Sequence, residues 1–154
     1  MTVKALILRT AGTNCDEETD FAFRLAGAET QKLHVNVLRE DPDKLAEFHI
    51  LAIPGGFSYG DDLGAGTVLA NELLTLLRPA LEQFVESGKL VIGICNGFQV
   101  LVKTGLLPGL TRWEQEATLT LNDSHRFEDR WVYLKAPASR CVLVEDGEFI
   151  YLPV

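Results

Sequence analysis

The feature that most constrains the fold is a regular alternation of short apolar runs with longer segments of helical period. Apolar runs rich in β-branched residues occupy Val3–Leu8, Gln31–Val37, His49–Ile53 and Leu90–Ile94. Helical period extends from about Asp16 to Leu25 and from about Glu72 to Glu86, where Ser87-Gly88 ends it. Strands that alternate with crossover helices lie parallel in one sheet. The pattern therefore predicts an α/β fold with a doubly wound, mostly parallel sheet.

After Gly109 the pattern changes to polar-apolar alternation, which is typical of strands with one solvated face. It covers Ala117–Leu121, Trp131–Leu134, Cys141–Val144 and Phe149–Leu152. Turn signals at Asn122-Asp123-Ser124 and Asp146-Gly147 separate these segments. We expect mostly antiparallel strands here, at one side of the sheet. Because the 154 residues contain no repeat or linker, residues 1–154 are expected to form a single domain.

Charge and apolar content restrict the classes of partner. The chain has 14 Lys plus Arg against 22 Asp plus Glu, a formal net charge of -8, with no basic run. Nucleic acid and anionic membrane surfaces are therefore not expected as ligands. The N-terminus lacks the cleavage pattern of a signal peptide, and no apolar stretch approaches the roughly 20 residues that span a bilayer. A cytoplasmic location is expected.

The three cysteines are an odd number without a CxxC pair, which argues against a disulfide framework and a zinc site. Cys15 precedes an acidic run that disfavours a thiolate, so a structural role is expected for it, and Cys141 lies in an apolar pattern typical of a core. The adjacent carboxylates of Asp61 and Asp62 point apart and lack further ligands. We expect no metal.

Cys95 follows a buried-type strand, in the arrangement Gly93-Ile94-Cys95-Asn96-Gly97 that leads into a helical stretch from Phe98 to Thr104. This is the pattern of a nucleophile elbow, with sulfur in place of oxygen. The flanking glycines leave room for a tight turn, which imposes an unfavourable backbone angle on the cysteine. The helix N-terminus favours thiolate over thiol, and its N–H groups can bind an oxyanion. Cys95 is thus a candidate nucleophile, with a buried structural cysteine as the alternative.

A second glycine-rich loop, which starts at Pro54-Gly55-Gly56 and continues to Asp62, follows the strand His49–Ile53. It should lie at the carboxyl edge of the sheet, where doubly wound folds bind their ligands. Its glycines can present N–H groups to an oxyanion. Alone, such a loop is equally a simple turn, but its convergence with the Cys95 elbow on one edge favours a binding role.

Long motifs in the chain resemble one family of class I glutamine amidotransferases, the glutaminase subunits of phosphoribosylformylglycinamidine synthase. They are LRTAGTNCDEETDFAFRLAGAE, PGGFSYGDDLGAG, GICNGFQVL and LNDSHRFEDRWV, in order across essentially the whole chain. The resemblance implies a flavodoxin-like sheet and a Cys95 nucleophile that attacks the side-chain amide of glutamine. It also implies a glutamyl thioester and the release of ammonia to a synthetase active site in purine biosynthesis.

The same resemblance implies the roles of further residues. The N–H groups of Gly56 and Asn96 would form the oxyanion hole. The residues implied to bind the substrate glutamine are Phe57, Gln99, Arg126 and Phe127. No cofactor is implied in this chain, since ATP and Mg belong to the synthetase. The implied partners are L-glutamine and the synthetase subunit, with a small third subunit as a further candidate.

The chain departs from the family pattern at its end. In the family a His-x-Glu segment, which supplies the base and its orienting acid, directly follows a strand like IYLPV, and this chain ends at Val154. His34, His49 and His125 do not obviously replace that base. We therefore expect poor turnover by this chain alone. Either it is a truncated piece of a longer subunit, or it is an impaired relative that docks the synthetase as a scaffold. A Cys-type α/β hydrolase is disfavoured because only His125 lies downstream of Cys95.

Overall fold

The computed structural model describes residues 2–109, 111–138 and 141–154. Contacts between Cα atoms divide the chain into two compact units, Met1–Leu119 and Thr120–Val154. The first unit contains the parallel sheet and the Cys95 elbow, and the second contains a pair of antiparallel strands.

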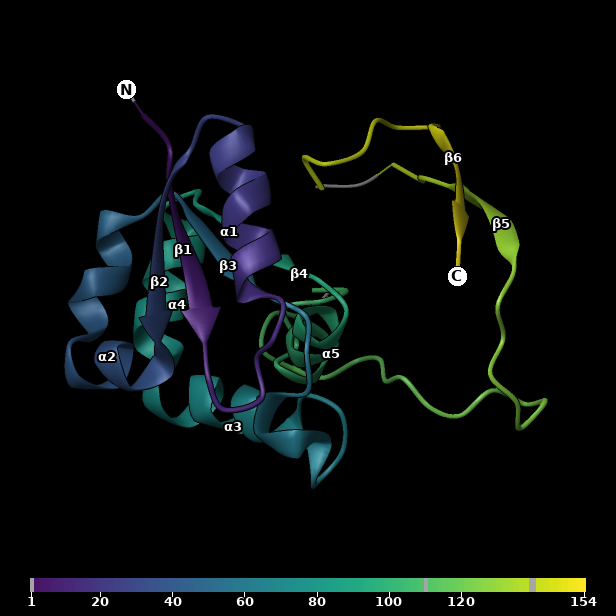
Figure 1. The fold of residues 1–154 in the computed structure, drawn as a ribbon, viewed down its shortest axis with the longest axis horizontal. Coiled ribbons are helices and arrows are strands. Elements are labelled where there is room, and N and C mark those ends of the chain that lie inside the picture. The colour runs from purple at the N-terminus through teal and green to yellow at the C-terminus, as the bar shows by residue number, and fades with distance from the viewer. Residues whose placement is uncertain (1, 110, 139–140) are drawn as a thin grey trace. The chain divides into compact units, whose positions relative to one another are not determined.

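The first unit is built on a four-stranded parallel sheet with the order β2-β1-β3-β4 (Figure 1). The strands are β1 (Lys4–Arg9), β2 (Glu29–His34), β3 (Ile50–Ile53) and β4 (Leu90–Gly93). The helices are α1 (Asp16–Leu25), α2 (Val35–Glu40), α3 (Thr67–Leu76), α4 (Arg78–Glu86) and α5 (Asn96–Lys103), with 3-10 turns η1 (Pro42–Glu47) and η2 (Ser58–Asp61). The predicted parallel α/β sheet is confirmed, and its strand order is that of flavodoxin-like folds.

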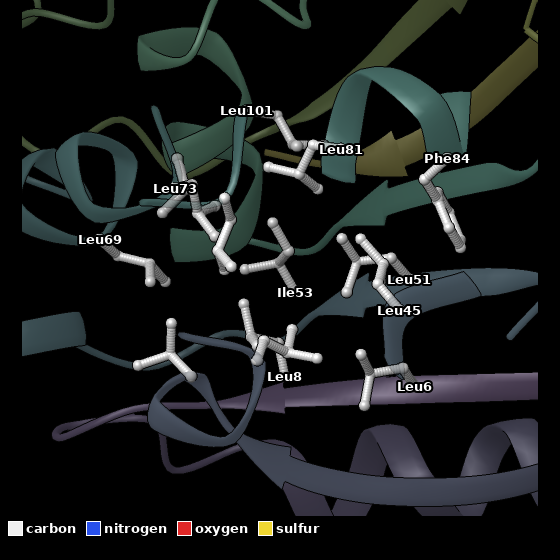
Figure 2. Packing of buried hydrophobic residues seen from close by; sticks show 14 of the residues in the cluster. Leu6, Leu8, Leu45, Leu51, Ile53, Leu69, Leu73, Leu81, Phe84 and Leu101 are labelled. Carbon is white, nitrogen blue, oxygen red and sulfur yellow. The ribbon is translucent and has the colours of Figure 1, made fainter. Parts of the chain in front are cut away.

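Alternate residues of the strands face opposite layers. Leu6 and Leu8 of β1 belong to the large cluster with α2, α3, α4 and α5. Figure 2 shows them beside Leu51 and Ile53 of β3, opposite leucines of the helices. Ala5 and Ile7 point to the other face, where Phe23 of α1 packs against them. Since both faces are covered, the central strands β1 and β3 are buried and mostly apolar, as the runs in the sequence indicated, whereas the edge strand β2 is largely polar.

Several predicted boundaries in the first unit are wrong, the first of them at the end of the second strand. The strand predicted at Gln31–Val37 ends at His34, and Val35 begins α2. The ring of His34 caps this helix, because its Nδ1 accepts a hydrogen bond of 3.2 Å from the N–H of Asn36. Val35 and Leu38 are buried on one helical face, so the β-branched residues there follow a helical rather than a strand period.

The single helix predicted from Glu72 to Glu86 is two helices. The first, α3, begins earlier, at Thr67, and a break at Leu77 separates it from α4. Pro79 occupies the first turn of α4, where its missing N–H leaves no helical hydrogen bond unmade. The helix predicted from Phe98 begins at Asn96, which places Cys95 directly at its N-terminus.

The second unit contains one antiparallel pair, β5 (Trp131–Lys135) and β6 (Phe149–Pro153), in a sheet separate from the parallel one. Antiparallel pairing in this third of the chain is confirmed. The strands predicted at Ala117–Leu121 and Cys141–Val144 are wrong, because neither segment is a strand in the described structure. Cys141 is exposed, so its predicted core position is wrong as well. Polar-apolar alternation alone predicted those strands, but a stable strand also needs a neighbouring strand to pair with.

Candidate active site

Cys95 lies between β4 and α5 with a strained backbone. Its φ is 52° and its ψ is -109°, and it occupies the N-cap position of α5. A positive φ in a residue with a Cβ costs about 1 to 3 kcal/mol and is found mostly at functional sites. The residue is exposed and its thiol is free. The predicted strained turn is therefore confirmed, and it presents the sulfur to solvent at the positive end of a helix.

The glycines on either side of Cys95 are required by close approach between backbones. A Cβ on Gly97 would lie 1.9 Å from the carbonyl oxygen of Ile53, at the end of β3. A Cβ on Gly93 would lie 2.4 Å from the carbonyl oxygen of Gly97. Only hydrogen atoms fit in these spaces. The start of α5 is thereby held against the ends of both β3 and β4.

The second glycine-rich loop lies directly against the elbow. A Cβ on Gly55 would lie in van der Waals contact with the Cβ of Cys95, at 3.4 Å, so this loop passes close beside the elbow. Gly56 follows with a φ of 134°. Within the described residues, no backbone hydrogen bond uses the N–H of Gly56 or of Asn96 as donor. Both groups are available to an oxyanion beside Cys95, as the sequence predicted, although their role stays a prediction.

A third segment supports this loop from the other side. The N–H of Phe57 donates to the carbonyl of Gly12 (2.9 Å), and that of Tyr59 donates to the carbonyl of Ala11 (2.7 Å). A Cβ on Gly12 would lie 1.9 Å from the carbonyl oxygen of Phe57. Sequence reasoning missed this support, although Gly12, shortly after the strand Val3–Leu8, is a signal for such a close approach.

The side chain of Asn96 is buried among polar groups of the same loop. It is 3% exposed, and its Nδ2 donates to Asp61 Oδ1 (3.0 Å) and to Gln99 Oε1 (3.1 Å). Its Oδ1 accepts from the N–H and the hydroxyl of Ser58. Gln99 is thus joined to the elbow through the Asn96 side chain, and its predicted role in glutamine binding stays a prediction.

Apolar side chains flank the elbow. Phe57, predicted to bind substrate, is 62% exposed, and Ile94 and Phe98 on either side of Cys95 are exposed as well. Nearby, Tyr59 donates its hydroxyl to Glu72 Oε2 (2.5 Å). Burial, followed by this hydrogen bond to the carboxylate, raises the pKa of Tyr59 above its ordinary value. Tyr59 thus stays protonated and joins η2 to α3.

Arg126 and Phe127, the other predicted substrate-binding residues, belong to the second unit. Both are exposed, and the carbonyl of Arg126 accepts a hydrogen bond of 2.9 Å from Nδ2 of Asn122. His125 lies in the same turn with a φ of 53°. The contribution of Arg126 and Phe127 to glutamine binding stays a prediction.

The side chains of His34, His49 and Cys15 each form a hydrogen bond within the first unit. Nδ1 of His34 caps α2, and Nδ1 of His49 accepts from the N–H of Lys4 (3.0 Å). The thiol of Cys15 donates to Asn14 Oδ1 (3.3 Å), and its backbone occupies the N-cap position of α1. These contacts agree with the structural role expected for Cys15.

Carboxylates at the site also have structural partners. Oδ1 of Asp61 accepts from the N–H of Gly66 (3.1 Å) in addition to the Asn96 amide. In the described parts of the chain, no three His, Cys, Asp or Glu residues come together as metal ligands. Nor does any described helix have the length and apolar character to cross a membrane.

The chain is similar to a known family over nearly its full length. The family model described as CobB/CobQ-like glutamine amidotransferase domain matches residues 2–154. Phosphoribosylformylglycinamidine synthase subunit PurQ of Dehalococcoides mccartyi is 60% identical over 153 residues, which are 99% of this chain and 60% of that protein. The subunit of the same name from Methanococcus maripaludis is 42% identical over 156 residues, 100% of this chain and 58% of that protein.

A solved structure agrees with these sequence relatives. PurLQS from Thermotoga maritima matches with a TM-score of 0.75 and 32% identity, over 100% of this chain and 66% of that chain. The present chain thus spans about 60% of the length of the first relatives it matches. The matched residues include the Cys95 elbow and the Gly56 loop. The chain belongs to the family of CobB/CobQ-like glutamine amidotransferase domains.

Proposed function

We propose that this chain is the glutamine-hydrolysing part of a phosphoribosylformylglycinamidine synthase and that Cys95 is its nucleophile. The observation that carries the proposal is the strained φ of 52° at Cys95, at the start of α5 and close beside the Gly56 loop. Strain of this kind persists only where the surrounding structure maintains it. A module that docks without hydrolysing glutamine does not account for this strain, so the scaffold alternative is not favoured.

The geometry supports acyl transfer from glutamine to sulfur. The Cys95 thiolate attacks the carbon of the side-chain amide, and the amide oxygen becomes an oxyanion. The N–H groups of Gly56 and Asn96 are the donors for this oxyanion, and the N-terminus of α5 stabilises its negative charge. The carbon–nitrogen bond then breaks, a proton is added to the leaving nitrogen, and ammonia and a γ-glutamyl thioester result. Water cleaves the thioester to glutamate and regenerates the thiol.

The proton transfers need a general base. The family's base belongs to a His-x-Glu segment, and residues 1–154 contain no counterpart of it. His34 and His49 use a ring nitrogen to accept local backbone N–H groups. Removal of a general base costs on the order of 10² to 10⁴ in rate. Acylation of Cys95 should therefore be slow in this chain and detectable in a single turnover.

The proposed partners follow from the same chemistry. Ammonia is released for a synthetase subunit that binds ATP and Mg, and this chain itself needs no cofactor. A small third subunit is a further proposed partner. Similarity to PurLQS of Thermotoga maritima supports a role within a larger assembly. The net charge of -8 favours a small molecule and a protein as binding partners over nucleic acid. We also propose a cytoplasmic location.

A single-turnover experiment tests this function. The chain is incubated with excess glutamine, quenched in acid and digested, and the Cys95 peptide is examined by mass spectrometry. We expect a γ-glutamyl adduct on Cys95 with slow release of glutamate, and neither in Cys95→Ala. The matched control, Cys141→Ala, alters an exposed cysteine of the second unit and should form the adduct normally. Glutamate release that survives in Cys95→Ala would contradict the proposal.

A further inference from the structure

We infer that the side chain of Asn96 is a positioning residue that holds the Gly56 loop and the Cys95 elbow in one geometry. Its backbone N–H is a proposed oxyanion donor, but its amide side chain points away into the protein and serves a separate purpose. The role of this side chain in catalysis rests on the proposed function of Cys95. We call Asn96 with its three side-chain partners, Ser58, Asp61 and Gln99, the Asn96 junction.

Every hydrogen-bonding group of the Asn96 side chain is used. Its oxygen accepts from the N–H of Ser58 (3.1 Å) and from the hydroxyl of Ser58 (2.7 Å). Its NH₂ group donates to Asp61 Oδ1 (3.0 Å) and to Gln99 Oε1 (3.1 Å). Two acceptor positions and two donors are all that an amide offers. Ser58 and Asn96 are both 3% exposed, so these bonds are shielded from water and costly to break.

The Asn96 junction connects two segments that have no backbone hydrogen bond to each other. Among the described residues, the last such bond between them joins the N–H of Ile94 to the carbonyl of Ile53 (3.0 Å), where the strands end. Beyond that point, no backbone hydrogen bond links residues 54–66 to residues 95–103. The loop instead bonds to Ala11 and Gly12 on its other side. Its hydrogen bonding to the elbow therefore depends on one side chain.

The proposed chemistry needs this connection because the two oxyanion donors come from different segments. Gly56 lies two residues before Ser58, and the second donor is the N–H of Asn96 itself. Oxyanion donors act only when both are held at hydrogen-bond distance from the developing charge. A displacement of about 1 Å between such groups costs on the order of 100-fold in rate. The Asn96 junction sets this separation.

The partners also explain why an amide occupies the position. Oδ1 of Asp61 accepts from both Asn96 Nδ2 and the N–H of Gly66, so Asp61 needs a donor at position 96. Asn96→Asp would keep the bonds from Ser58 but would place a buried carboxylate in contact with the half-buried carboxylate of Asp61, which is unfavourable. Adding Asp61→Asn supplies a new donor and removes one charge. The exchanged pair should therefore rescue the geometry.

The experiment compares two reactions of the Cys95 thiol. The γ-aldehyde analogue of glutamine forms a thiohemiacetal: a carbon–sulfur bond forms, the carbonyl π bond breaks, and the oxygen becomes an oxyanion that takes up the thiol proton. Iodoacetamide alkylates the same sulfur with loss of iodide and forms no oxyanion. Aldehyde affinity is measured by calorimetry, and the alkylation rate is measured at a pH where the thiol is fully ionised.

We expect Asn96→Asp to weaken aldehyde binding about 100-fold, the size of a lost oxyanion donor. Ser58→Ala, a milder change that removes only the 2.7 Å bond, should weaken it about tenfold. Alkylation should remain within about twofold of the original chain in both. The double variant Asn96→Asp with Asp61→Asn should recover most of the affinity. Ser87→Ala is the matched control, because it removes a hydroxyl that donates to Phe84 at the end of α4.

Aldehyde binding that is unchanged in both Asn96→Asp and Ser58→Ala would overturn the inference. Equal losses in aldehyde binding and alkylation would also overturn it, because they would indicate a general disturbance of Cys95. Failure of the unaltered chain to bind the aldehyde would instead contradict the proposed function. Hydrogen exchange of residues 54–66 then decides the matter: faster exchange in Asn96→Asp supports the junction, and unchanged exchange refutes it.

Discussion

The two units of this chain use apolar residues in opposite ways. The first unit buries apolar side chains on both faces of its parallel sheet, mostly leucines on one face and alanine and isoleucine on the other. In the second unit, Ala136 is the one buried hydrophobic residue among those described. Its large side chains lie at the surface of a two-stranded sheet, where the ring of Tyr151 is 4.9 Å from that of Trp131 and 4.5 Å from that of Tyr133. The first unit therefore has its own core, whereas the second is held by cross-strand pairs.

The difference predicts unequal costs for side-chain truncation. Leu51→Ala removes a side chain that is 1% exposed in the centre of the first core, and we expect a loss of about 2 to 5 kcal/mol in the free energy of unfolding. Tyr151→Ala removes a ring that is 54% exposed, and we expect less than about 1 kcal/mol. Urea unfolding of the two variants measures both. Equal losses would show that the second unit is packed as tightly as the first.

Glycine substitutions sharpen the same comparison. A Cβ on Gly97 would collide with the backbone of Ile53, so Gly97→Ala should cost about 3 kcal/mol and displace the Cys95 elbow. Gly147 has a φ of 82° but nothing within 4 Å of an added Cβ. Gly147→Ala should therefore cost about 1 kcal/mol, from backbone strain alone. Thermal unfolding of both variants measures which one loses more stability. A larger loss in Gly147→Ala than in Gly97→Ala would contradict the comparison.

Sequence patterns predicted the first unit well because its physical causes are local. Each buried strand is a continuous apolar run, and α1 has the predicted bounds of Asp16 and Leu25. The missed break at Leu77 and the missed helix α2 depend on details of capping. In the second unit, Trp131–Lys135 found a partner strand and Ala117–Leu121 did not, although both alternate. Polar-apolar alternation does not determine whether a segment finds a strand to pair with.

The candidate site shows the same limit. The strained Cys95 and the adjacent glycine-rich loop were predicted from spacing, because the turn and the sheet edge are consequences of local sequence. The Asn96 junction was not predicted, since it joins side chains as far as 38 residues apart. The support of the loop by Ala11 and Gly12 also escaped prediction, because it depends on contact between segments distant in sequence.

Labelling of the chain by a diazo-ketone analogue of glutamine tests most directly whether Cys95 is an activated nucleophile in a glutamine-shaped site. The reaction is followed by peptide mass spectrometry with and without excess glutamine, and with Cys95→Ala as control. We expect modification of Cys95 alone, suppressed by glutamine and absent in the variant. Labelling that is spread over Cys15 and Cys141, or that glutamine does not suppress, would contradict the assignment.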